Sequence, residues 1–163
     1  MLQDNDVTYT QIRIHMDQGR GYQNQIIMTD MKIQEFKGIG MMYGEKFTNI
    51  GVMMLSDLLN KGKTLEGRRD LALKSGIEES LILKWVNQAD LTRINGVGPV
   101  FSELLEASGV DTVNELKMRN PENLINKLVE VNNMKNIAQS LPTPHQIEKF
   151  VSEAKELEPM VTY

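Results

Sequence analysis

The sequence contains no cysteine, only two histidines and one tryptophan among its 163 residues. Without cysteine, disulfides, thiolate metal sites and thiol nucleophiles are all excluded. The histidines, His15 and His145, each lack a neighbouring set of ligands, so a zinc site is not expected. Asp57 and Glu115 precede apolar residues on short helices, and we expect both to be solvated surface charges. No set of residues predicts a reaction, so we expect a protein that is not an enzyme and needs no cofactor.

The chain also lacks long apolar runs and an excess of positive charge. Its apolar runs are far too short to span a bilayer, and its first residues, MLQDNDVTYTQ, are polar and acidic, unlike a signal peptide. These features predict a soluble cytoplasmic protein without membrane contact. The 18 Lys and Arg residues are outnumbered by 22 Asp and Glu residues, which gives a net charge of −4. Nucleic-acid-binding proteins are usually basic, so this balance weighs against such a role without excluding it.

Signals for helix starts and ends are dense from residue 31 to residue 158. Thr64 has the position of an N-cap and Gly76 that of a helix end. Asn120 and Thr143 are N-cap residues that each precede a proline suited to the first helical turn. Trp85 lies on an apolar stripe at helical spacing and is expected in the core. The sequence therefore predicts an all-α fold for this region.

Residues 1–30 have a different character. The stretch VTYTQIRIH is rich in β-branched residues, DQGRG is a turn signal, and YQNQIIM follows it. This pattern favours a short N-terminal arm that forms a β-hairpin. We expect the arm to be ordered by packing on the helices, by adding to a neighbouring chain or by a crystal contact.

The motif FKGIG at residues 36–40 recurs as INGVG at residues 94–98, an offset of 58 residues. The pairs that match at this offset are Phe36 and Ile94, Gly38 and Gly96, Gly40 and Gly98, Glu45 and Glu103, Phe47 and Leu105, Gly51 and Gly109, Val52 and Val110, and Leu58 and Leu116. So many matches at one offset indicate an internal duplication. We place the first repeat at residues 31–90 and the second, with a C-terminal tail, at 91–163.

Both motifs are typical of a turn that precedes a helix. Glycines permit the turn and let a ligand approach the backbone, while Ile39 and Val97 between them anchor the turn in the core. The N-terminus of a helix exposes unpaired N–H groups and carries a partial positive charge, so it favours a phosphate. Each turn is therefore a candidate phosphate site.

This pattern resembles the helix-hairpin-helix motif. Each unit resembles the small helical DNA-binding domain at the start of archaeal and eukaryotic recombinases. In that domain a characteristic segment follows the first hairpin, and ASGVDTVNEL at residues 107–116 of this chain has the same form. The order of elements, the segment KGKTLEGRRDLALKSGI and the ending EPMVTY also resemble a family of tandem degenerate helix-hairpin-helix repeats, catalogued only as a domain of unknown function. The resemblance covers residues 31–163. It implies two tandem repeats, each with a degenerate second hairpin, and a monovalent cation at the hairpin carbonyls is implied by the resemblance alone.

The first hypothesis for function is non-sequence-specific binding of DNA or another nucleic acid. DNA-binding members of the motif carry a cation two or three residues after the second glycine, where this chain has Met42 and Tyr43 in one copy and Val100 and Phe101 in the other. Residues 35–90 hold eight cations and eight anions, whereas residues 91–163 hold seven and ten, so the first copy is the better candidate. The candidate residues are Gly38, Ile39 and Gly40 with Lys37, Lys46, Lys61, Lys63, Arg68 and Arg69, and, more weakly, Gly96, Val97 and Gly98.

The alternative hypothesis is a protein-interaction or assembly adaptor whose hairpins no longer bind phosphate. Four methionines, Met41, Met42, Met53 and Met54, lie around the first hairpin. Methionine suits adaptable protein contacts, and Met41 and Met42 are the candidates, with Met42 expected to be exposed. The partner, the oligomeric state and the role of the arm stay open at this point.

Overall fold

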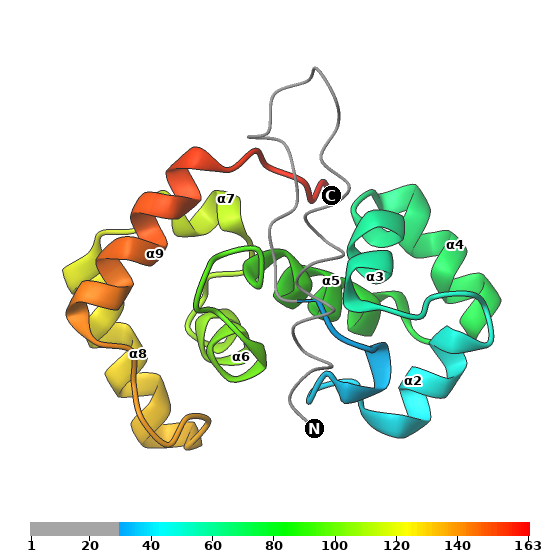
Figure 1. Cartoon of the computed structure of the whole chain (residues 1–163), viewed down its shortest axis with the longest axis horizontal. Helices are drawn as coiled ribbons and strands as arrows, with labels where there is room; N and C mark the ends of the chain where they lie inside the picture. Colours follow the sequence, from blue (N-terminus) through cyan, green and yellow to red (C-terminus); the bar gives the residue numbers. More distant parts are fainter. Residues whose placement is uncertain (1–29) are drawn as a thin grey trace.

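The computed structural model describes residues 30–163 and is all-helical there, with no strand in that range (Figure 1). The helices are η2 (Ile33–Glu35), α2 (Gly40–Thr48), α3 (Leu55–Gly62), α4 (Leu65–Ser75), α5 (Glu79–Leu91), α6 (Pro99–Ala107), α7 (Val113–Leu116), α8 (Pro121–Lys135) and α9 (Pro144–Glu156). The predicted all-α class is confirmed for this part of the chain. The predicted β-hairpin arm falls on residues outside it.

Predicted helix boundaries agree with the capping contacts. The hydroxyl of Thr64 accepts from Gly67 N at 3.0 Å, and that of Thr143 accepts from Gln146 N at 3.1 Å. The amide oxygen of Asn120 accepts from Asn123 N at 3.0 Å. These bonds satisfy backbone N–H groups that the first helical turn leaves without partners.

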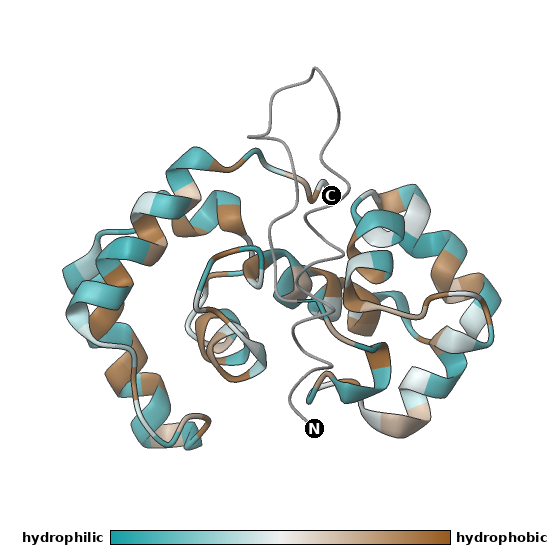
Figure 2. Cartoon of the chain, viewed as in Figure 1, coloured by the Kyte–Doolittle hydropathy of each residue, from teal (hydrophilic) through white to brown (hydrophobic). Residues whose placement is uncertain are grey.

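Two apolar cores divide the described chain into a first half, residues 30–90, and a second half, residues 91–163. The first core is built mainly by η2, α2, α3, α4 and α5, and it contains Phe36, Phe47 and Trp85, as predicted for Trp85. The second is built by the end of α5 and by α6 to α9, and it includes Leu104 and Phe150. Figure 1 shows these helices as two groups on either side of α5. Figure 2 shows apolar and polar residues interspersed along the outer helices, as expected for helices that bury one face.

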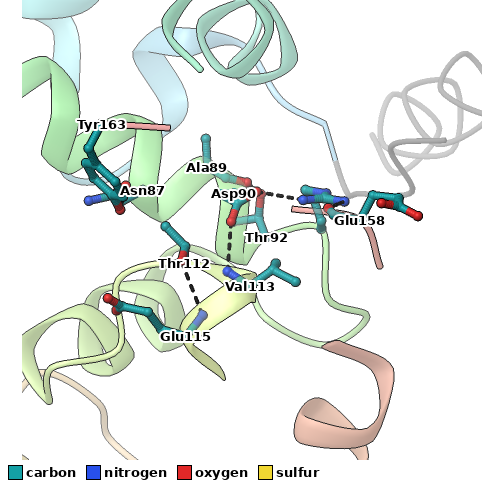
Figure 3. Close-up of polar contacts among 10 residues, drawn as sticks. Asn87, Ala89, Asp90, Thr92, Thr112, Val113, Glu115, Glu158 and Tyr163 are labelled. Atoms are coloured by element: carbon teal, nitrogen blue, oxygen red, sulfur yellow. Dashed lines mark hydrogen bonds and ion pairs between the residues drawn. The ribbon is translucent and has the colours of Figure 1, made fainter. Parts of the chain in front are cut away.

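Helix α5 joins the halves, and every residue from Trp85 to Leu91 is buried. Near its end the carboxylate of Asp90 accepts from Arg93 Nη1 at 2.7 Å and from Val113 N, at the start of α7, at 2.8 Å (Figure 3). Both charged side chains are almost fully buried. Burial raises the pKa of Asp90, while Arg93 and the Val113 N–H oppose this rise.

The last six residues, 158–163, leave the end of α9 and run back towards the first half, where the C-terminus lies beside α3 in Figure 1. Met160 and Val161 pack against the first core. Within residues 30–163, none of the helices combines the length and the apolar character needed to cross a bilayer.

Candidate functional site

The first turn, residues 36–40, is anchored by two buried apolar side chains. Phe36 and Ile39 lie in the first core, and Ile39 N donates to Phe36 O at 2.9 Å. Gly38 is exposed between them. Gly40 has a positive φ of +72°, a conformation in which a side chain is strained, and α2 begins at this residue. The glycines therefore expose backbone at the start of α2, as the motif predicts.

The second turn, residues 94–98, is anchored in the same way by Ile94 and Val97, and Val97 N donates to Ile94 O at 3.0 Å. Here the positive φ, +93°, occurs at Gly96. The N–H of Asn95 faces the carboxylate of Glu153 from α9, with both oxygens at 3.2 Å. The Glu153 carboxylate therefore already occupies the N–H of Asn95, and this N–H is not free for a phosphate.

The two helices that follow these turns begin without a side-chain cap from the described residues. By contrast, α4, α7, α8 and α9 begin at capping Thr or Asn side chains, and the Asp57 carboxylate accepts from Met53 N and Met54 N, at 3.0 and 2.9 Å, before α3. Free N–H groups at a helix start attract anions. The starts of α2 and α6, like that of α5, therefore have no side-chain acceptor of their own within residues 30–163.

A hollow of about 490 Å³ lies where the first turn meets the start of α6. Its lining combines Lys37, next to Gly38, with Val100 and Phe101 of α6 and with the loop at residues 136–140. It therefore offers one cation, one aromatic ring and several polar groups, among them the side chains of Gln139 and Ser140.

The loop at residues 136–140 is held by a single side chain, Asn132 of α8. Its amide oxygen accepts from Ile137 N and Ala138 N at 2.9 and 2.8 Å, and its Nδ2 donates to Ala138 O at 3.0 Å. Asn136 takes a left-handed conformation, φ +52°, which asparagine tolerates. Relative to the first repeat, the second carries extra residues here, NNMKNIAQSLPT, but no sequence signal placed them beside Lys37.

The predicted basic residues differ in their exposure. Lys37, Lys46, Lys61, Lys63 and Arg69 are exposed. Arg69 lies 3.6 Å from the carboxylate of Glu79, so part of its charge is already balanced. Lys61 lies near Gly51, just after the end of α2.

The prediction that Arg68 contacts a nucleic-acid backbone is wrong. Arg68 is 1% exposed, its Nη1 donates to Gly62 O at 2.8 Å, and its Nη2 donates to Thr162 O at 2.7 Å. Burial lowers the pKa of Arg68, an effect opposed by Glu79 and Tyr163. The guanidinium is therefore committed to two backbone carbonyl groups of the protein and is not free for a ligand.

The methionines near the first turn lie on the surface. Met41 is 75% exposed and Met42 65% exposed, as expected for Met42, and Met53 is 52% exposed. No group of three or more His, Asp or Glu residues within residues 30–163 is arranged to hold a metal ion. Exposed apolar side chains thus lie next to a turn of the phosphate-binding type. Two kinds of ligand, a nucleic acid and a protein, are to be considered for this surface.

Comparison with known proteins gives one match. A family model described as "Domain of unknown function (DUF4332)" matches residues 37–157. No curated protein and no solved structure matches the chain. The matched range contains the glycines of both turns and the residues that line the hollow.

Proposed function

The chain belongs to the DUF4332 family, and we propose that it is a non-enzymatic binding module that holds nucleic-acid backbone phosphates at the first turn and the adjoining hollow. The observation that carries this proposal is the hollow itself. There Lys37, which precedes Gly38 in the chain, and the uncapped first turn of α6, at Val100 and Phe101, line one space. A cation together with free helix-start N–H groups suits a phosphate.

We also propose that the two halves are tandem helix-hairpin-helix repeats. Several backbone hydrogen bonds recur at the offset of 58 residues. Among them are Ile39 N to Phe36 O and Val97 N to Ile94 O, at 2.9 and 3.0 Å; Gly51 N to Thr48 O and Gly109 N to Glu106 O, both 3.1 Å; and Val52 N to Phe47 O and Val110 N to Leu105 O, both 2.9 Å. These bonds close the turn before a helix and the turn after it. They support a repeated unit in whose second copy the Glu153 carboxylate accepts from Asn95 N.

The ring of Phe101 extends the range of possible ligands. It lines the hollow and is half-buried, packed on Phe150 with ring centroids 6.4 Å apart. Aromatic rings beside a cation suit unpaired bases, because every base has a flat face for stacking. Both a duplex and a single strand are therefore needed as probes.

A second candidate function is a protein-interaction adaptor, favoured by Met41 and Met42. Their exposed thioethers occupy the helix turn where DNA-binding hairpins carry cations, and adaptable apolar side chains suit a protein partner. The net charge of −4 also fits this alternative better. The two candidates make opposite predictions for Met42.

The test is a fluorescence anisotropy titration with a short labelled DNA duplex and its single strand, from about 50 to about 200 mM NaCl. We expect binding that weakens as salt rises. Lys37→Gln is expected to lower the slope of log affinity against log salt by about one, because one phosphate contact is lost. The matched control is Lys155→Gln, which removes an exposed charge at the end of α9 away from the loop at residues 136–140.

Met42→Lys separates the two candidates. It places a cation where DNA-binding hairpins have one, so the nucleic-acid proposal expects tighter binding at low salt. An absence of binding at the lowest salt, or equal effects of Lys37→Gln and Lys155→Gln, would contradict the proposal. In that case the adaptor candidate takes its place.

A further inference from the structure

Residues 158–163, the tail, make specific contacts with the first half although they follow the last helix of the second. Thr162 N donates to Lys63 O at 2.8 Å, which links positions 99 residues apart in sequence. The hydroxyl of Tyr163 donates to Asn87 Oδ1 at 3.4 Å. Met160 and Val161 cover part of the first core. The tail is thus docked by both backbone and side chains.

Two buried arginines hold the tail, one near each end of it. Arg68 Nη2 donates to Thr162 O at 2.7 Å, and Arg93 Nη2 donates to Glu158 O at 2.8 Å. Arg93 is completely buried and also binds Asp90. The guanidinium of Arg68 lies 5.8 Å from the centre of the Tyr163 ring, within the range of a cation–π contact.

Burying an arginine is costly unless its donors find acceptors. Within residues 30–163, two of the ten buried polar or charged residues are arginines, and both direct an Nη donor to a carbonyl of the same six-residue segment. A segment that only covered apolar surface would not need such receptors. The arrangement therefore indicates that the two arginines serve to dock the tail.

The tail also runs between the two halves, whose other described contacts include α5 against α6 and the bond from Val113 N to Asp90. The cores of the two halves are separate, and α5 packs on α6 where the halves meet. Domains joined by a small interface move relative to each other unless something fixes them. We propose that the tail is a strap that holds the two halves at one angle, with Arg68 and Arg93 as its anchors.

The strap has a consequence for the hollow beside the first turn. Lys37 belongs to the first half, whereas Val100, Phe101 and the loop at residues 136–140 belong to the second. The angle between the halves sets the width of this hollow. The strap proposal does not rest on the proposed function, because the angle is measured without any ligand.

The experiment measures a distance between the halves by pulsed electron spin resonance. The chain has no native cysteine, so Leu73→Cys on α4 and Met134→Cys on α8, both highly exposed positions, label cleanly. In the full-length chain we expect one narrow distance distribution. Removal of residues 158–163 is expected to broaden the distribution and shift its mean, with the helical circular dichroism retained.

Two substitutions complete the test. Thr162→Pro removes the N–H that donates to Lys63 O and keeps the rest of the tail, so the distribution should broaden in the same direction. Glu158→Ala keeps the carbonyl that Arg93 binds and should leave the narrow distribution unchanged. If the truncated chain fails to fold, Thr162→Pro decides the outcome. A distribution as narrow in Thr162→Pro as in the full-length chain overturns the proposal.

Discussion

In the turn at residues 36–40 the backbone is left-handed at the second glycine, Gly40, with φ +72°, whereas in the turn at residues 94–98 it is left-handed at the first, Gly96, with φ +93°. The difference has a local cause. Proline disfavours the helical region for the residue before it, and Pro99 follows Gly98, which is extended at φ −102° and ψ −162°. The change of chain direction therefore falls two residues earlier in the second turn. The same letters, glycine-apolar-glycine, thus specify two different helix starts.

A similar contrast holds for the two buried arginines. Arg93 forms an ion pair with Asp90, whereas Arg68 donates to the carbonyls of Gly62 and Thr162 and has no carboxylate within salt-bridge distance among the described residues. The cost of removing each arginine should therefore differ, because only one of them leaves a buried charge behind.

The largest effect is expected for Arg93→Met. Asp90 would remain buried without its partner, so the free energy of unfolding should fall by about 3–5 kcal/mol. Arg68→Met leaves two carbonyls without donors and should cost less, about 1–3 kcal/mol. Urea unfolding followed by circular dichroism measures both. The double variant Asp90→Asn/Arg93→Met should lose less than Arg93→Met alone, and equal losses for Arg68→Met and Arg93→Met would remove the contrast.

Next in size is Gly96→Ala. A Cβ at this residue would lie 3.1 Å from Phe150 Cε1, and its φ of +93° is unfavourable for any side chain. Strain and overpacking together should cost about 2–4 kcal/mol in the same unfolding experiment. The control is Gly98→Ala, where no atom lies within 4 Å and φ is ordinary, and which should cost less than about 1 kcal/mol.

In the first turn we expect the substitution of the second glycine, Gly40, to cost more stability than that of the first, Gly38. Gly40→Ala meets no atom within 4 Å, so only its positive φ opposes it, at about 1–2 kcal/mol. Gly38→Ala would make ordinary contacts at 3.5 Å with Trp85 and Gln88 and should change stability by less than about 0.5 kcal/mol. A larger loss for Gly38→Ala than for Gly40→Ala would mean that the two turns share one geometry after all.

Much of the helical layout could be predicted from sequence because its signals are local. Thr64, Asn120 and Thr143 are caps as predicted, since a capping bond joins residues only three apart. The burial of Arg68 could not be predicted in this way, because its acceptor Thr162 lies 94 residues further along the chain. A basic run such as Lys61 to Arg69 carries no information on which member is buried.

For Asp57 and Glu115, too, a contact with the backbone was missed from the sequence. We expected Asp57 and Glu115 as solvated charges, and Glu115 is indeed exposed and Asp57 half-buried. The expectation missed that the Asp57 carboxylate also accepts from Met53 N and Met54 N, and that of Glu115 from Asp111 N at 2.7 Å. Both close the backbone just before a short helix. Acidic residues in that position are a capping signal that spacing from the helix start could have revealed.

The smallest predicted effect concerns Asp111, the second-half residue that corresponds to Met53 in the first half. The residue whose N–H is capped is Met53 in the first half but Asp111 in the second, where burial first, and then Glu115 and Glu106, raise the pKa of Asp111. A carboxyl whose pKa is raised on folding stabilises the fold while it is protonated, and this contribution is lost as the pH rises through the folded-state pKa. Asp111→Asn should therefore be slightly more stable than the native chain at pH 7, with the difference shrinking towards pH 4 as Asp111 becomes protonated. Thermal unfolding at several pH values measures this, and a difference that grows as the pH falls would show that the charge of Asp111 is favourable in the folded chain.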